Sequence, residues 1–103
     1  MMFLALERDF AGVTEAEYAP HLAAEAAQAW ELYQQGIIRE LYFRSDRDEA
    51  VLVLECPDTD SAQAVLSTLP LVRHGLITFE LIPLIPYPGF ARLFAESGST
   101  GAE

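Results

Sequence analysis

Two segments of the chain, residues 50–56 and 76–84, are apolar at almost every position. If each is a strand, neighbouring side chains such as Val51 and Leu52 point to opposite faces, so both faces of the sheet are apolar there. Half-solvated sheets alternate apolar with polar residues, and soluble monomers avoid large exposed apolar patches. We therefore expect two copies of the chain to pack sheet against sheet. The alternative is that the C-terminal segment of the same chain folds across the second face.

Apolar patterns, together with Gly, Pro and Asp punctuation, predict four strands and two helices. The strands are expected at 2–8, 37–44, 50–56 and 76–84, and the helices at 15–35 and from Asp58 or Asp60 to Leu69. Pro70 is expected to end the second helix, with a connector at 71–75 and one apolar helical turn at 90–94. The order βαββαβ is that of the α+β, ferredoxin-like fold, in which both helices cover one face of a four-stranded antiparallel sheet.

The length and composition of the chain narrow its class. A single domain is expected over residues 1–95, followed by a Ser-, Gly- and Thr-rich tail at 96–103 that is predicted to be disordered. Sixteen acidic residues against six arginines, with no lysine, make nucleic acid and anionic membranes poor partners and exclude Schiff-base chemistry through lysine. One cysteine, no membrane-length apolar run and no signal-peptide pattern favour a cytoplasmic protein.

The long first helix has a clear beginning and end, and one internal interruption. Thr14 with Glu17 forms a capping-box pattern, and Gly36 is placed to end the helix. Pro20 lies inside the span and removes a backbone hydrogen bond. Either the helix kinks near 18–20, or a short first turn precedes a main helix that starts at Pro20.

Glu25 is the first candidate functional residue. An apolar stripe expected to face the sheet runs through Leu22, Ala26, Ala29, Trp30 and Tyr33. Glu25 falls at the edge of this stripe, where apolar neighbours raise the pKa of a carboxyl and suit it to proton transfer. The alternative is an interfacial glutamate with a solvated head, paired with His21 one turn earlier.

Arg39 is the second candidate, because strand alternation groups it with Ile37, Leu41 and Phe43. An arginine among apolar side chains needs either a carboxylate, such as Glu25 or Glu55, or a bound anion. The same alternation groups Tyr42 with Ile38, Glu40 and Arg44 on the opposite face.

His21 is the third candidate, either as a structural residue or as an acid/base group. His74 lies far away in the sequence, and the chain has no histidine pair or cluster with metal-ligand spacing, so no metal site is expected. Phosphate-binding loops, nucleophile elbows and dinucleotide fingerprints are also missing from the sequence, so no cofactor is expected.

The stretch from Glu25 to Leu84 resembles the muconolactone isomerase family. The similarity lies in Gly36-x-x-Arg39 followed by Tyr42, in the hairpin, and in Leu69-Pro70-Leu71 ahead of the last strand. Counting back from Gly36 without gaps places Glu25 where that family has a helix glutamate. The resemblance implies a dimeric α+β barrel, often in larger assemblies, that moves a proton on an unsaturated lactone of aromatic-ring degradation without a cofactor.

The sequence also departs from that family. Glu40 stands where the family has a histidine after its strand arginine, and Pro86-Tyr87-Pro88-Gly89-Phe90 replaces a polar C-terminal arm. A weaker similarity connects Pro20-His21-Leu22 and the region 69–83 with YCII-related proteins, whose His–Asp pair needs an aspartate near residue 69 that is not there.

These observations give two hypotheses. In the first, the protein is a cofactor-independent isomerase acting on a small unsaturated lactone or related carboxylate, with Glu25 as the base, Arg39 holding a substrate carboxylate and His21 as an auxiliary acid/base group. In the second, it is a non-catalytic small-ligand-binding or assembly protein on the same barrel. An open pocket containing Glu25 and Arg39 favours the first, and a filled interior in which they pair favours the second.

Overall fold

The computed structural model describes residues 1–94 of the chain and has the predicted element order. The strands are β1 (Met2–Asp9), β2 (Ile38–Phe43), β3 (Ala50–Glu55) and β4 (Ile77–Leu84). The helical segments are α1 (Glu15–Tyr18), η1 (Ala19–His21), α2 (Leu22–Gln34), α3 (Thr59–Leu66), α4 (Pro70–Arg73) and η2 (Pro88–Leu93). The tail expected to be disordered, 96–103, lies outside the described residues.

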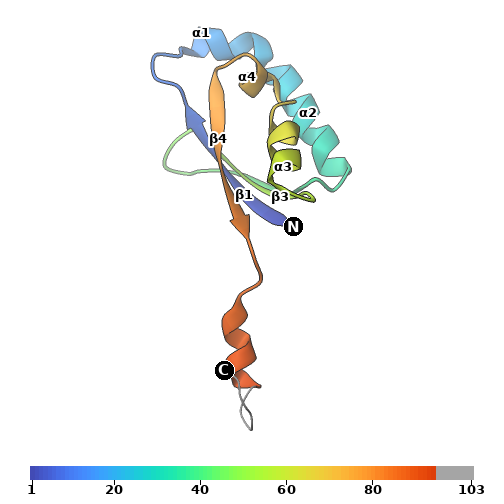
Figure 1. The fold of residues 1–103 in the computed structure, drawn as a ribbon. Helices are drawn as coiled ribbons and strands as arrows, with labels where there is room; N and C mark the ends of the chain where they lie inside the picture. Colours follow the sequence, from blue (N-terminus) through green and yellow to red (C-terminus); the bar gives the residue numbers. More distant parts are fainter. Residues whose placement is uncertain (95–103) are drawn as a thin grey trace.

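The strands form one antiparallel sheet in the order β2-β3-β1-β4. The central strand β1 pairs with both neighbours, so that Ala5 lies opposite Leu52 on β3 and Leu81 on β4. Helices α1 to α4 lie on one side of this sheet (Figure 1). The α+β, ferredoxin-like fold predicted from the order of elements is confirmed.

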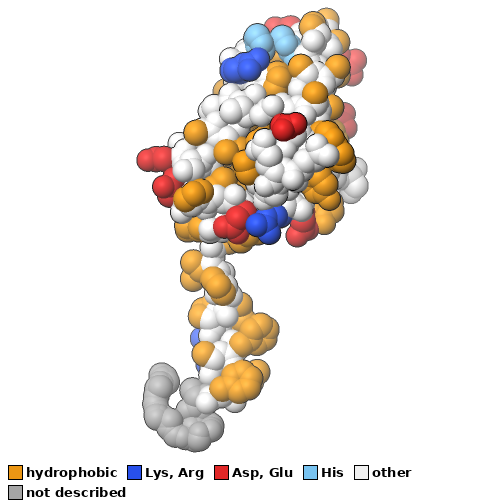
Figure 2. Space-filling view, turned by 90° about the vertical axis from the view of Figure 1, so that its right-hand side faces the viewer, with side chains coloured by type: hydrophobic (Ala, Val, Ile, Leu, Met, Phe, Trp, Pro, Cys, Tyr) orange, Lys and Arg blue, Asp and Glu red, His pale blue; other side chains and the backbone are white. Residues whose placement is uncertain are grey.

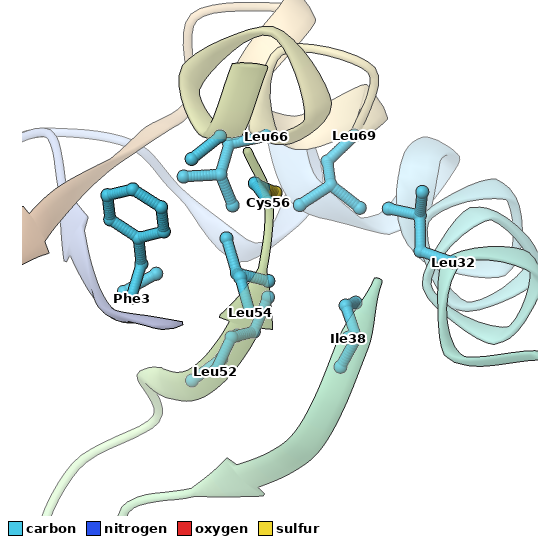
Figure 3. Close-up of a cluster of buried hydrophobic side chains, with 11 residues drawn as sticks. Phe3, Leu32, Ile38, Leu52, Leu54, Cys56, Leu66 and Leu69 are labelled. Carbon is cyan, nitrogen blue, oxygen red and sulfur yellow. The ribbon is translucent and has the colours of Figure 1, made fainter. Parts of the chain in front are cut away.

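The core fills the space between the sheet and the helices. Phe3, Ile38 and Leu54 point from the sheet, and Leu32, Leu66 and Leu69 meet them from the helix layer (Figure 3). Full burial of a large apolar side chain stabilises a fold by roughly 1.5–3 kcal/mol. This cluster therefore anchors one end of the layer, where α3 and the C-terminal half of α2 cover the sheet.

A β-bulge at Arg39 changes the side of the sheet to which the first residues of β2 point. Ile38 pairs with Leu54, but Glu40 pairs with Val53, so the register shifts by one residue between them. Ile38 and Leu41 consequently lie on the same side, facing the helices. The predicted grouping of Ile38 with Tyr42 is wrong, because strict alternation fails where a bulge inserts an extra residue.

The first helix is divided around Pro20, so it has both the short first turn of one predicted alternative and the interruption near 18–20 of the other. Glu17 accepts a hydrogen bond from the Thr14 backbone N–H at 2.9 Å, which closes the predicted capping box at the start of α1. Pro20 lies in the single 3-10 turn η1, and the main helix α2 begins two residues later. Gly36 follows it with φ of 79°, a left-handed conformation that suits glycine at a helix end.

The buried face of α2 is rotated from the predicted stripe. Leu32 is 5% exposed, whereas Leu22, Trp30 and Tyr33 are about half exposed, at 52%, 58% and 49%. The predicted stripe included Trp30 and Tyr33, but these two rings stack on each other on the outer surface. As a result Glu25 lies within the face that looks toward the sheet and not at its edge.

The predicted connector at 71–75 is also wrong, because Pro70 begins a helical turn there. Leu69 adopts an extended conformation and Pro70 takes the first position of α4, where its missing N–H costs nothing. The chain leaves this turn at Gly75, whose φ is 73°. This turn brings the backbone N–H of Leu71 within hydrogen-bond distance of Glu25 on α2.

Beyond β4 the chain leaves the body of the protein. The segment 85–94 extends away from the sheet (Figure 1), and Figure 2 shows that its surface is largely apolar. Ile85, Tyr87, Phe90, Leu93 and Phe94 are all more than 60% exposed. The alternative in which this segment folds across the open face of its own sheet is therefore wrong. Within residues 1–94, no helix is long and apolar enough to cross a membrane.

Candidate functional site

A cavity of about 660 Å³ lies between the sheet and the helices α1 and α2, beyond the end of the core. Its size falls within the range typical of small-molecule sites. The space exists because alanines stand where larger side chains would fill it, at Ala26 and Ala29 on α2 and at Ala50 on β3. The lining is Glu7, Asp9, Glu15, Tyr18, Ala19, Leu22, Glu25, Ala26, Ala29, Leu41, Phe43, Asp48, Ala50, Leu52, Leu69, Leu71 and Phe79.

Glu25, the principal candidate from the sequence, lies on the wall of this cavity. Its Oε1 accepts a hydrogen bond of 2.9 Å from the backbone N–H of Leu71. Burial raises the pKa of Glu25, and the Leu71 hydrogen bond opposes that rise. The result is a positioned carboxylate in a largely apolar pocket, as general-base chemistry requires.

The partner of Glu25 is a consequence of the α4 turn. Leu71 is the second residue of α4, and first-turn N–H groups have no acceptor within their own helix. Glu25 satisfies one of them, which ties α2 to α4 and fixes the direction of the carboxylate. The alternative of a solvated Glu25 paired with His21 does not describe the structure.

A second carboxyl, Glu7, lines the same cavity and was missed from the sequence. It is only 7% exposed, and its Oε1 accepts a 2.8 Å hydrogen bond from the Ala50 backbone N–H. Burial, a hydrogen bond with Asp9 and the nearby negative charges of Asp9 and Glu49 raise its pKa to about 8, against the smaller opposing effect of the Ala50 N–H. Strand alternation could have identified Glu7 as an inward-facing residue, because it continues the buried row of Phe3 and Ala5.

Tyr18 and Asp9 extend this polar wall. Tyr18 is half-buried, and burial, followed by the charges of Asp9 and Glu7, raises its pKa. Asp9 lines the same wall and is exposed. The wall formed by β1 and α1 therefore connects a buried carboxyl, an exposed carboxylate and a phenol.

Arg39 does not line the cavity. It is exposed at the bulge, and its Nε donates a hydrogen bond of 2.6 Å to the Gly36 carbonyl. Neither predicted partner pairs with it: Glu25 binds Leu71, and Glu55 forms an ion pair with the amino terminus. The structure therefore does not bring Glu25 and Arg39 together, either across a pocket or in a filled interior.

His21 also lies outside the cavity lining. Its ring stacks on that of His74, with centroids 4.1 Å apart and an interplanar angle of 24°. The fold thus brings together two histidines that are remote in the sequence. Among residues 1–94 no group of three or more His, Cys, Asp and Glu side chains is arranged to hold a metal ion.

Two solved structures share this architecture over most of the chain. It resembles a crystal structure of muconolactone isomerase with a TM-score of 0.70 and 21% identity, covering 85% of this chain and 92% of that one. It also resembles 5-chloro-2-hydroxyhydroquinone dehydrochlorinase from Burkholderia phenoliruptrix AC1100, solved with 2,5-dihydroxybenzoquinone, with a TM-score of 0.64, 19% identity and coverage of 82% and 94%. At these identities the likenesses show a shared fold.

Sequence comparison goes further than the fold. No curated protein sequence matches the chain significantly. The model of the muconolactone delta-isomerase family, however, matches residues 5–89, which include β2, β3 and β4, most of β1, and the residues that line the cavity between sheet and helices. The resemblance noted from Gly36, Arg39 and the Leu69-Pro70-Leu71 motif is thereby confirmed over most of the chain, and the protein belongs to the muconolactone delta-isomerase family.

Proposed function

We propose that the protein is a cofactor-independent isomerase that moves a proton between two carbons of a small unsaturated lactone or a related compound. The observation that carries this proposal is the position of Glu25: a carboxylate held by a backbone N–H on the wall of a largely apolar cavity. Membership of the muconolactone delta-isomerase family supports it. The shared fold with a dehydrochlorinase solved with a quinone is consistent with a small cyclic substrate.

The reaction requires a base beside a carbon acid. Glu25 would take a proton from the carbon next to the double bond that is conjugated with the carbonyl, and the electron pair of the broken C–H bond would move into the conjugated system. Return of that proton to a different carbon completes the isomerisation without oxidant, reductant or cofactor. Apolar neighbours such as Ala29, Leu52 and Leu71 would exclude water from the intermediate.

The lining also bears on how a substrate is held. The part of the cavity supplied by residues 1–94 of one chain contains several acids and no basic residue. The role expected for Arg39, to hold a substrate carboxylate, and the auxiliary role expected for His21 gain no support from it. We propose that the reacting part of the substrate inside this cavity is uncharged.

The test of this proposal is the substitution Glu25→Gln assayed with muconolactone and a panel of related unsaturated lactones. Glutamine keeps an oxygen that can accept the Leu71 N–H, so the fold should be retained while the base is lost. We expect turnover to fall about 100-fold or more, in line with general-base contributions. Isomerisation and solvent deuterium incorporation can both be followed by NMR.

Glu31→Gln is the matched control, because Glu31 lies on the same helix, is exposed and hydrogen-bonds only Gln35 among the described side chains. It should retain wild-type turnover. Unchanged turnover by Glu25→Gln would contradict the base assignment. A wild type that binds lactones without turning any over would favour the alternative of a non-catalytic ligand-binding protein.

We also propose that the functional unit is a homodimer or a larger homo-oligomer. The sheet face opposite the helices carries Leu4, Val53 and Ile82 beside the exposed Tyr42. The C-terminal segment of the same chain leaves this face open and is itself apolar. Both surfaces are of the kind that a second copy would bury.

Sedimentation equilibrium at micromolar concentration should give a mass at least twice the 11.4 kDa of one chain. The substitution Val53→Glu places a charge in the middle of the open face and should shift the protein toward monomer. Gln63→Glu on the exposed side of α3 is the control and should leave the mass unchanged. A wild-type monomer would contradict the proposed sheet-against-sheet assembly.

A further inference from the structure

Two carboxyl groups face the cavity from different layers of the fold. Glu25 belongs to α2 in the helix layer, whereas Glu7 belongs to β1 in the sheet. Each has one oxygen fixed by a backbone N–H, from Leu71 in the first case and from Ala50 in the second. A substrate lying between sheet and helix would therefore meet a positioned carboxyl on each side.

The surroundings of the two groups differ in a way that separates their protonation states. Glu7 is more than nine-tenths buried, while Glu25 is partly exposed. The charged side chains that act on Glu7 are both acidic, Asp9 on its own strand and Glu49 at the hairpin. Arg44 and Arg47 approach Glu49 and not Glu7. These surroundings keep the proton on Glu7 at neutral pH, where its raised pKa of about 8 leaves the group uncharged.

We propose that Glu7 is a second catalytic residue of the cavity, a general acid that donates its proton to the substrate carbonyl oxygen while Glu25 removes a proton from carbon. This inference rests on the proposed isomerase function and assigns the acid to its base. A carboxylic acid kept neutral by its environment is an effective hydrogen-bond donor to a developing enolate.

The two groups complete a balanced cycle. Glu25 breaks the C–H bond and keeps the proton, the electron pair moves toward the carbonyl oxygen, and the Glu7 O–H proton passes to that oxygen to give an enol. In the second half, the enol proton returns to Glu7 and Glu25 delivers its proton to the new carbon. Both side chains end in their starting states, and the substrate differs only in the position of its double bond.

Asp9 is an exposed neighbour of the buried Glu7 side chain. Asp9 lies on the same cavity wall as Glu7, where its charge acts on Glu7, and it is itself exposed at the end of β1. A buried acid that loses its proton to bulk solvent through such a contact can recover it the same way.

The test is the substitution Glu7→Gln, measured with muconolactone as substrate. Glutamine reproduces the shape of a neutral carboxylic acid and can still accept the Ala50 N–H, but it has no proton to transfer. We expect kcat to fall about 100-fold with KM little changed, since general acids contribute at least that much. Wild-type kcat should also fall as the pH rises through about 8, because the acid is then lost. Glu7→Asp keeps an acid and should retain more activity than Glu7→Gln.

A second measurement reads the proton on Glu7 directly. The infrared C=O band of a protonated carboxyl should be present in the wild type at pH 7, weaker in Glu7→Gln and unchanged in the control Glu31→Gln. Absence of the Glu7-dependent band, or turnover retained by Glu7→Gln, would overturn the acid assignment alone. Absence of any wild-type turnover would instead contradict the isomerase function and the catalytic role together.

Discussion

Glu7 and Glu49 are the two buried glutamates among the described residues, at 7% and 5% exposure, and their charged neighbours are of opposite sign. At the β2–β3 hairpin, Oε1 of Glu49 lies 3.1 Å from Arg47 Nε and 3.7 Å from Arg44 Nη1. At the cavity, Glu7 has a backbone N–H and an aspartate beside it. The positive charges of Arg44 and Arg47 offset the cost of burying Glu49. Glu7 has no such contact to its carboxyl group and keeps its proton instead.

The difference shows how position, and not residue type, decides what a glutamate can do. The Glu49 carboxyl group lies within ion-pair distance of two guanidinium groups and links residues of the hairpin. A carboxyl deprived of cations takes up and releases a proton near neutral pH, which is the property that an acid catalyst needs. None of the arginines at residues 1–94 contributes to the lining of the cavity.

The largest expected effect concerns the stability of Glu7→Gln as a function of pH. Folding raises the pKa of Glu7 from its ordinary value of 4.5 to about 8. The stability that this proton contributes is fully present below pH 4.5 and is lost as the pH rises to about 8. In that window the group lowers the unfolding free energy by roughly 1.4 kcal/mol per pH unit.

Because glutamine has no titrating proton, the difference between the variant and the wild type should move in favour of the variant by about 3 kcal/mol between pH 5 and pH 7.5. Urea unfolding at a fixed protein concentration across this range measures the difference. A constant difference between the two proteins would mean that Glu7 is already ionised at pH 5, and the contrast with Glu49 would disappear.

A smaller effect on stability is expected from removing the two arginines that approach Glu49. The double substitution Arg44→Gln and Arg47→Gln leaves Glu49 buried without a counter-charge, and breaking a buried pair from one side is destabilising. Both arginines are partly exposed, so water compensates for part of the loss. We expect the thermal midpoint to fall by about 5 °C at pH 7.5, the scale of one kcal/mol in a domain of this size.

Restoring Arg47 alone should recover most of the midpoint, because its Nε makes the shorter contact. If the double variant melts like the wild type, the arginines are not what makes Glu49 different from Glu7.

Local signals in the sequence placed most elements correctly. The capping box at Thr14 and Glu17, the glycine at position 36 and the aspartate at 58 mark helix ends through contacts between near neighbours. Such contacts form wherever the rest of the chain lies, so they can be recognised without a structure. Glu25 was identified for a similar reason, since helical periodicity and family resemblance both point to it.

The errors arose where distant segments decide the outcome. Sequence alternation grouped Ile38 with Tyr42 on one face, and the two are separated by the bulge at Arg39 in the pairing with β3. The buried face of α2 is set by what it packs against, so Leu32 is buried and Trp30 is not. The connector at 71–75 contains a turn of helix whose free Leu71 N–H meets a glutamate forty-six residues earlier.

The sequence by itself determined the order of strands and helices, the acidic character of the chain and the presence of a helix glutamate of the kind that its family carries. The tertiary structure alone decided that Glu25 shares a cavity with Glu7, that Arg39 and His21 lie outside it, and that arginines approach the carboxyl group of Glu49 but not that of Glu7. The physical reason is range: periodicity and capping depend on residues a turn or a strand apart, whereas burial and charge environment depend on which remote segments the fold brings together.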